Sequence, residues 1–277
     1  MRIFLTGATG FVGSHFINLA HAAGHEVVAL RRTREALPRV AAVREPTWLT
    51  RALGEVTEQD LVEVDVLMHL AAAGTTAGSS NWDELLEANV VAPAKLTLTA
   101  ARAGVNQIVV AGSCLEYGHA AARYEFIPPN APLEPSGPYA ASKAAGGVLL
   151  RTMAEQHKLR FTYARLFSVY GVGQHERNLW PMIRRAALAG EDLPLTPGEQ
   201  LRDFISVEQV AQQLLALAAA QNVEPGVPHV CNLGTGLPQS VRQFAEHWWR
   251  EFGARGNLLF GSLAYRNDEV MRYVAQV

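Results

Sequence analysis

A glycine-rich turn directly after the first apolar run constrains the fold of this chain more than any other feature. The run Ile3–Thr6 leads into TGATGFVG at residues 6–13, and a long amphipathic stretch follows. Between a strand and a helix, Gly7 permits a tight turn, Gly10 lets the backbone approach a pyrophosphate, and Gly13 lets the helix lie close to the sheet. The amino end of that helix offers free N–H groups to phosphates. The turn therefore predicts a dinucleotide-binding site; the alternative is an ordinary strand-to-helix turn.

Beyond this turn, nearly continuous apolar runs alternate with amphipathic stretches, as in parallel strands covered by helices on both faces. The pattern predicts an α/β fold with a doubly wound parallel sheet, a Rossmann domain, over residues 1–166. Over 167–277, glycine, proline and polar clusters separate the helices, which predicts a smaller C-terminal substrate-binding lobe, with the chain re-entering the sheet near 201–233. The third strand has only weak candidates, near Val40 and Trp48. Strands are expected at 3–6, 27–30, 64–70, 107–111 and 161–166, and helices at 11–23, 82–103, 139–157, 182–189, 207–220 and 241–252.

Composition excludes several classes of protein. Of the 277 residues, 49% are hydrophobic and 18% are charged, which is enough apolar material for a sizeable core and excludes disorder. The formal net charge of −2 gives no strong field toward nucleic acid or a membrane, and no apolar run is long enough for a membrane span. The amino-terminal run is too short for a signal peptide. Cys114 and Cys231 suit two structural thiols, so we expect no metal site and a cytoplasmic protein.

The end of the second strand bears on the choice of cofactor. An NAD site usually has an acidic residue there, about twenty residues after the turn, which accepts from the ribose hydroxyls. Residues 28–32 read VALRR and contain no carboxylate. The guanidinium groups of Arg31 and Arg32 would instead pair with a 2′-phosphate. The two residues predict NADP rather than NAD; the alternative is a solvated basic loop, since Arg34 follows.

A serine, a tyrosine and a lysine are spaced for proton transfer. Tyr139 is the one tyrosine of seven with a lysine four residues later, and one helical turn places it on the same face as Lys143. The ammonium is expected to lower the pKa of the phenol from its ordinary value of about 10. Ser113 follows a predicted strand, where its hydroxyl can bond the same substrate oxygen. Alone, the Tyr-Lys spacing suits a half-exposed helical pair; with the serine and the glycine turn it predicts catalysis.

On these residues, the chain resembles the extended short-chain dehydrogenase/reductase family, in the branch of NAD(P)-dependent nucleotide-sugar epimerases, dehydratases and reductases. The resemblance extends over nearly the whole length. Its further motifs are HLAA at 69–72, NV at 89–90, SCLEYG at 113–118, RLFSVYG at 165–171, NL at 178–179, RDF at 202–204 and NLG at 232–234.

The resemblance implies roles for individual residues. Ser113, Tyr139 and Lys143 would form the catalytic set, while Asn178 and Arg202 would hold the diphosphate of a nucleotide sugar, with Ser113 also touching the substrate. An Asp that relatives usually have after the third strand, to contact adenine, is missing between residues 39 and 54. The expected cofactor-binding residues are Gly7, Thr9, Gly10, Phe11, Val12, Gly13, Arg31, Arg32, Leu70, Ala71, Ala72, Tyr139, Lys143 and Leu166.

The reaction is predicted from departures from the family's patterns. Dehydratases of the family carry Asp-Glu directly after the hydroxyl residue, whereas this chain has Cys114 and Leu115, so dehydration is not expected. A net reductase commonly draws on NADPH, so Arg31 and Arg32 favour reduction. We predict NADPH-dependent reduction of a keto group on a nucleotide-linked 4-keto-6-deoxy sugar, with Tyr139 protonating the alkoxide. The alternatives are a nucleotide-sugar 4-epimerase with tightly bound NAD and a non-catalytic NADP-binding protein. The resemblance also implies a homodimer, formed through the helices at 82–103 and 139–157.

Overall fold

Seven parallel strands form the central sheet of the computed structural model, which describes residues 1–75, 81–266 and 269–277. Their order across the sheet is β10-β6-β5-β4-β1-β2-β3. The chain leaves β1 on one side for β2 and β3 and on the other for β4, so the crevice that binds ligands in such sheets lies at the carboxyl ends of β1 and β4. The strands are β1 (Arg2–Thr6), β2 (Glu26–Arg31), β3 (Thr47–Thr50), β4 (Val66–His69), β5 (Gln107–Ser113), β6 (Arg160–Leu166) and β10 (His229–Leu233).

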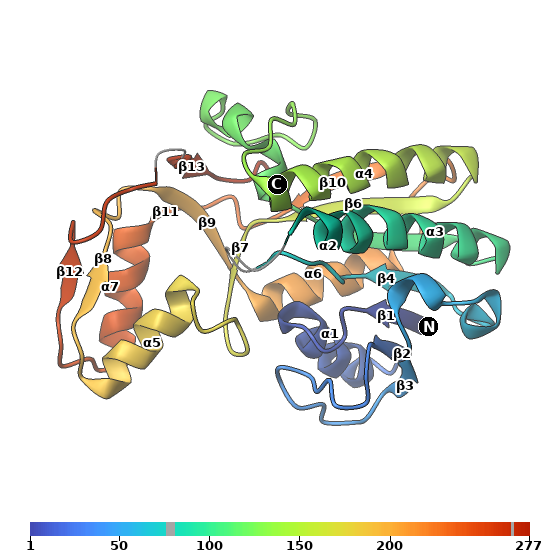
Figure 1. Cartoon of the computed structure of the whole chain (residues 1–277), viewed down its shortest axis with the longest axis horizontal. Helices are drawn as coiled ribbons and strands as arrows, with labels where there is room; N and C mark the ends of the chain where they lie inside the picture. Colours follow the sequence, from blue (N-terminus) through green and yellow to red (C-terminus); the bar gives the residue numbers. More distant parts are fainter. Residues whose placement is uncertain (76–80, 267–268) are drawn as a thin grey trace.

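Helices cover both faces of this sheet (Figure 1). Because successive side chains of a strand point to opposite faces, Phe4 packs in the cluster under α3 and α4, while Ile3 and Leu5 pack in the cluster under α1 and α6. Both clusters are almost completely buried, which explains why the strands read as unbroken apolar runs. One face carries α1 (Phe11–Ala22) and α6 (Val207–Ala219), and the other carries α2 (Trp82–Leu86), α3 (Ala92–Arg102) and α4 (Pro138–Gln156).

A smaller lobe lies beyond the carboxyl edge of the large sheet (Figure 1). An aromatic cluster forms its core: the Phe204 and Phe244 rings stack with centroids 3.8 Å apart, and the Trp180 and Trp248 rings meet edge to face at 5.6 Å. Two small sheets surround this core, one of β7, β9, β11 and β13 and one of β8 and β12. The elements are β7 (Ser168–Tyr170), α5 (Leu179–Ala189), β8 (Leu193–Leu195), β9 (Leu201–Ser206), β11 (Pro238–Ser240), α7 (Val241–Glu251), β12 (Leu258–Phe260) and β13 (Arg272–Tyr273).

The doubly wound parallel sheet is confirmed, and the structure adds detail that the sequence left open. The third strand is β3, at Trp48 rather than near Val40. The chain returns from the lobe to the large sheet as α6 and β10, whereas β9 pairs only within the lobe. A chain that crosses twice between two bodies has no single boundary, so the division at residue 166 stays a prediction.

The helix expected over 82–103 is interrupted by a π-helical turn, Glu87–Val91. Asn89 in this turn accepts from the Ala73 backbone N–H at 2.9 Å and donates to Ser142 Oγ at 2.9 Å. The turn therefore ties α4 to the segment that follows β4. Within the described ranges, no helix combines the length and apolarity that a membrane span needs.

Candidate active site

The glycine turn between β1 and α1 leaves a backbone cradle at the carboxyl edge of the sheet. Gly7 has a φ of +72°, and a Cβ there would meet the Ala71 nitrogen at 2.7 Å. A Cβ on Gly13 would collide with the Gly7 carbonyl oxygen, so the missing side chain brings α1 against the turn. Gly10 begins the helix without a side-chain cap, and the first helical turn has no acidic residue. Its free N–H groups therefore fit the diphosphate of a dinucleotide, as expected for residues 7–13.

The residues after β4 lie against this turn. The register pairs Thr6 with His69, so the two strands end side by side. Leu70 N donates to the Thr6 carbonyl oxygen and Ala71 N to Thr6 Oγ1, both at 3.3 Å. Ala72 follows half-buried. Farther along the same edge, the last residue of β6, Leu166, pairs in register with Ser113.

The two arginines at the end of β2 have different surroundings. The Arg31 guanidinium lies 4.9 Å from the Trp48 ring centre, and its Nε donates to Thr50 Oγ1 at 3.2 Å. Residues of β3 therefore hold it along the sheet edge. Arg32 is exposed. The position after β3, where relatives usually have an Asp, is taken by Arg51, which pairs with Asp60 at 2.7 Å.

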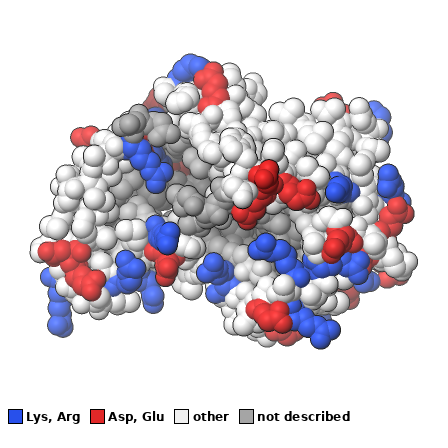
Figure 2. Space-filling model, in the orientation of Figure 1, with Lys and Arg blue, Asp and Glu red and all other residues white. Residues whose placement is uncertain are grey.

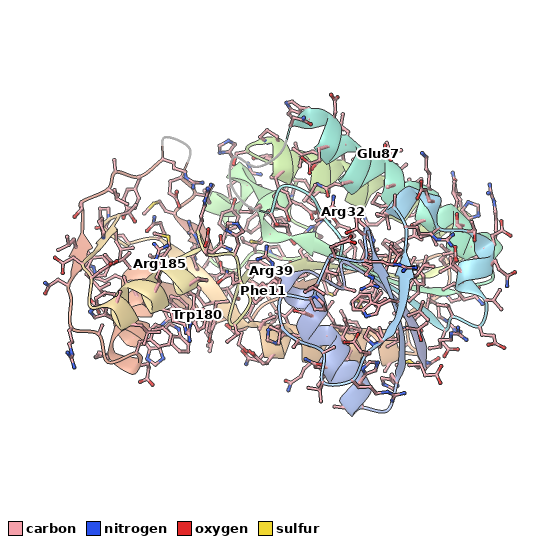
Figure 3. The ribbon with its side chains drawn as sticks, turned by 60° about the horizontal axis from the view of Figure 1, so that its bottom comes forward. Phe11, Arg32, Arg39, Glu87, Trp180 and Arg185 are labelled. Carbon is pink, nitrogen blue, oxygen red and sulfur yellow. The ribbon has the colours of Figure 1, made fainter. Side chains whose placement is uncertain are left out.

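Arg39, which the sequence did not indicate as a site residue, also lies near the glycine turn. The Arg39 backbone N–H donates to the Thr9 carbonyl oxygen at 3.2 Å, which folds the segment after β2 over the turn. Figure 3 shows Arg39 close to Phe11, with Arg32 nearer to Glu87. In Figure 2, basic side chains line the lower edge of the hollow between the lobes. No sequence motif indicates Arg39, because its position depends on the conformation of the segment between β2 and β3.

Ser113, Tyr139 and Lys143 gather at the carboxyl end of β5. Ser113 ends this strand and is buried, and its hydroxyl lies near the phenol of Tyr139 in the first turn of α4. Lys143, also buried, reaches the same strand, where its Nζ donates to the Ala111 carbonyl oxygen at 2.7 Å. The three predicted catalytic side chains therefore share one strand end, at the edge that carries the glycine turn.

The electrostatics of Tyr139 differ from the expectation that Lys143 lowers its pKa. Burial raises the pKa of the phenol above its ordinary value, the charge of Glu116 raises it further, and the nearby Ser113 hydroxyl lowers it. Burial lowers the pKa of the Lys143 ammonium, while Glu116 raises it. The spacing of one helical turn sets a common face, but it does not reveal that Lys143 bonds a carbonyl oxygen and that a carboxylate lies nearby.

The two residues expected to hold a diphosphate come from different elements of the small lobe. Arg202, on β9, donates to Glu269 Oε1 at 2.7 Å and lies 5.5 Å from the Tyr273 ring centre. The charge of Arg202 also acts on Cys114, the residue after Ser113. Burial raises the pKa of the Cys114 thiol to about 12, and the charge of Arg202 contributes in the opposite direction. Asn178 begins α5 with no side-chain bond to the helix end.

His69 and the cysteines do not suit acid-base work. Burial, followed by the charge of Lys143, lowers the pKa of His69 to about 3, and its Nδ1 is bonded to Thr6 Oγ1 at 2.7 Å. Cys114 and Cys231 are free, and burial raises the pKa of the Cys231 thiol to about 11. Across the residues that the structure describes, no group of three or more His, Cys, Asp or Glu side chains could hold a metal ion.

The chain is similar to proteins with known activities along most of its length. Residues 3–234 match the model described as the NAD dependent epimerase/dehydratase family. A UDP-glucose 4-epimerase from Streptomyces lividans is 31% identical over 273 residues, covering 88% of this chain and 79% of that protein. A dTDP-6-deoxy-L-talose 4-dehydrogenase (NAD(+)) from Aggregatibacter actinomycetemcomitans is 27% identical over 268 residues, covering 93% of this chain and 92% of that protein.

A solved structure extends the similarity to three dimensions. The structure of MoeE5 in complex with UDP-glucuronic acid and NAD superposes with a TM-score of 0.85 at 29% identity, and covers 100% of this chain and 90% of that chain.

Proposed function

The chain belongs to the NAD dependent epimerase/dehydratase family, and we propose that it transfers a hydride to or from carbon 4 of a nucleotide-linked hexose. The observation that carries the proposal is the meeting of Ser113 and Tyr139 at the carboxyl end of β5, where Lys143 of α4 also bonds the strand and where the glycine turn lies at the same sheet edge. Two relatives named for chemistry at position 4, an epimerase and a dehydrogenase, support the choice of that carbon.

Of the two possible outcomes of this chemistry, we put 4-epimerisation with a retained NAD first. The UDP-glucose 4-epimerase relative and the neighbour solved with NAD support it. This reverses the order predicted from the sequence, in which Arg31 and Arg32 favoured NADPH-dependent reduction.

Reduction of a 4-keto sugar with NADPH remains the second candidate because of one feature of the site. The end of β2 has no carboxylate for the ribose hydroxyls, and the residue that follows it, Arg32, is exposed. With Arg31 held by Trp48, Arg32 is the residue best suited to a 2′-phosphate.

The residues of the site have distinct roles in either reaction. A nicotinamide dinucleotide, with its diphosphate held at the glycine turn, would supply the hydride chemistry. Ser113 orients the oxygen on carbon 4, and Tyr139 exchanges its proton. A phenol with a raised pKa is protonated at neutral pH, which suits proton donation to the alkoxide formed when a hydride is added. For hydride removal, the first step of epimerisation, the same phenol must start deprotonated and accept the proton of the C4 hydroxyl. Arg202 and Asn178 hold the diphosphate, for which a guanidinium fork is well suited.

One set of measurements separates the two candidates. The purified protein is denatured and the released nucleotide identified; it is also incubated with UDP-glucose without added cofactor, and with a dTDP-linked 4-keto-6-deoxyglucose plus NADPH or NADH. Epimerisation predicts released NAD and formation of UDP-galactose. Reduction predicts an empty preparation and oxidation of NADPH only in the presence of the keto sugar. Absence of hydride transfer from any of a panel of nucleotide sugars would contradict both candidates.

We also propose that the protein is a homodimer formed through α2, α3 and α4. Trp82 and Leu86 on α2 and Val148 and Leu149 on α4 are exposed apolar side chains on one covering layer of the sheet, with exposed fractions of 53%, 45%, 49% and 40%. Apolar side chains gathered on one surface favour association. Light scattering of the purified protein would give the mass of a dimer, and Leu149→Glu would yield a monomer with an intact fold.

A further inference from the structure

A buried ion pair lies directly behind Ser113, and the mechanism above does not use it. Glu116 is completely buried and Arg165 is 2% exposed, and Glu116 Oε2 accepts from Arg165 Nε at 2.8 Å. The other carboxylate oxygen accepts from the Ser113 backbone N–H at 2.7 Å and from the Tyr163 hydroxyl at 2.8 Å. Both oxygens are therefore fixed by short hydrogen bonds, one of them to the catalytic serine itself.

Hydrogen bonds on the far side of Arg165 hold this pair in place. Its Nη1 donates to the Tyr117 hydroxyl at 3.0 Å and to the Pro129 carbonyl oxygen at 2.9 Å, and the Tyr117 hydroxyl donates to Asn232 Oδ1 at 2.7 Å. A buried ion pair is often no more stabilising than apolar side chains of similar volume, because both charges lose their water. Its place against the catalytic strand end therefore points to a role in the site rather than in stability alone.

We propose that Glu116 is a positioning residue for Ser113, Tyr139 and Lys143: its carboxylate, held by Arg165, fixes the Ser113 main chain and supplies the negative charge that faces the phenol and the ammonium. The catalytic meaning of this inference rests on the proposed function. The same charge raises the pKa of both Tyr139 and Lys143, so it keeps the phenol protonated and the ammonium charged.

Among the charged groups that act on the Tyr139 phenol, Glu116 has the largest effect. The Cys114 thiol acts in the same direction as Glu116, but burial keeps it neutral. Arg202 and Asp203 of the small lobe act on Cys114 with opposite signs. Among the described residues, the groups that face the site are Ser113, Cys114, Glu116 and Tyr117 from the end of β5 and η4 (Cys114–Tyr117), Tyr163 and Arg165 from β6, His69 from β4, Lys143 from α4, and Arg202 and Asp203 from β9.

The test measures the protonation of residue 139 without any substrate. A difluorotyrosine, whose ring is more acidic than that of tyrosine, is incorporated in place of Tyr139, and its ¹⁹F resonance is followed against pH. We expect Glu116→Gln to lower the midpoint of this titration by about 1 pH unit or more. The matched control is Glu134→Gln, which removes a carboxylate from an exposed pair with Arg123 and should leave the midpoint unchanged. Equal midpoints in Glu116→Gln and the unsubstituted protein would overturn the inference.

A second variant covers the risk that an unpaired Arg165 prevents folding. Glu116→Gln/Arg165→Met removes both buried charges, and its midpoint should still lie below that of the unsubstituted protein; an equal midpoint would overturn the inference here too. The titration also separates this inference from the proposed function. A shifted midpoint in a protein that transfers no hydride supports the inference alone, whereas hydride transfer with an unshifted midpoint supports the proposed function alone.

Discussion

The large sheet and the small lobe contribute different parts of the candidate site, and they position their residues in different ways. On the large sheet, Ser113 and the glycine turn lie at the ends of parallel strands, so a short motif and the sheet edge together define their place. In the lobe, Arg202 is held by Glu269, 67 residues farther along the chain. The place of the strand-end residues therefore follows from local spacing, whereas the part of the site that we propose to hold the substrate depends on long-range packing.

Loss of the Tyr139 phenol should remove most of the activity that we assign to the edge of the large sheet. Tyr139→Phe should lower kcat by a factor of about 10²–10⁴, because a positioned proton donor contributes that much, while cofactor affinity stays close to that of the unsubstituted protein. Turnover and nucleotide binding are measured on the same preparation. Tyr265→Phe, which removes a hydroxyl bonded to Glu199 in the lobe, is the control and should keep full activity. Normal turnover by Tyr139→Phe would contradict the assignment of proton transfer to Tyr139 at the end of β5.

The large sheet could be predicted almost entirely from the sequence, because its strands are buried on both faces and read as apolar runs. The two edge strands were the exceptions. β3 was ambiguous, since Trp48 and Leu49 are half-buried, and β10 was expected only as a return of the chain to the sheet near 201–233, since the first three of its five residues are exposed or half-buried. The positions of Ser113 and the glycine turn followed from the same runs.

The electrostatics of the site could not be predicted in the same way. Glu116 lies three residues after Ser113, but its burial against Arg165 depends on the pairing of β5 with β6, which brings together residues 49 apart in the chain. The bond from Lys143 to the Ala111 carbonyl oxygen depends on how α4 packs over β5. Sequence spacing predicts which residues lie at the same edge of the sheet, whereas tertiary packing sets the burial and the charged neighbours that shift their pKa values.

The two cores offer a second contrast, in stability. Phe244→Ala removes a 2% exposed ring from the lobe cluster and should cost about 3–5 kcal/mol, since it leaves a cavity among aromatic rings. The matched variant Phe161→Ala removes a fully buried ring from the large sheet and should cost a similar amount. We expect the cofactor to raise the Tm of the large sheet in the Phe244 variant by as much as in the unsubstituted protein, as measured by calorimetry. Complete loss of that stabilisation would mean that the variant no longer binds the cofactor, so that the lobe core is needed to form the cofactor site.

Substitution of Arg202 separates substrate binding by the small lobe from the chemical step, because the two affect KM and kcat differently. Arg202→Met should raise KM for a nucleotide sugar about 10- to 100-fold, since a charge-assisted hydrogen bond contributes about 1.5–3 kcal/mol, and should leave cofactor affinity unchanged. Arg242→Met is the matched control, because Arg242 is a lobe arginine that lies 3.9 Å from the Phe260 ring centre and donates to the Pro197 carbonyl oxygen. A fall in kcat with an unchanged KM would instead assign Arg202 to the chemical step.

A weaker, pH-dependent effect should show whether water reaches the edge of the large sheet at His69. His69 has a folded-state pKa of about 3, below its ordinary value of 6.5, so between these pH values the unfolded chain binds the extra proton. Its contribution to stability is therefore complete above pH 6.5 and is lost as the pH falls toward 3, by about 1.4 kcal/mol per pH unit. His69→Gln has no such proton, so the difference in unfolding free energy between the two proteins should shrink from pH 7 to pH 5 in urea titrations. His157→Gln, at an exposed position, is the control. A difference that stays constant with pH would mean that the imidazole keeps its ordinary pKa. Water would then reach His69 at the end of β4 before any ligand binds.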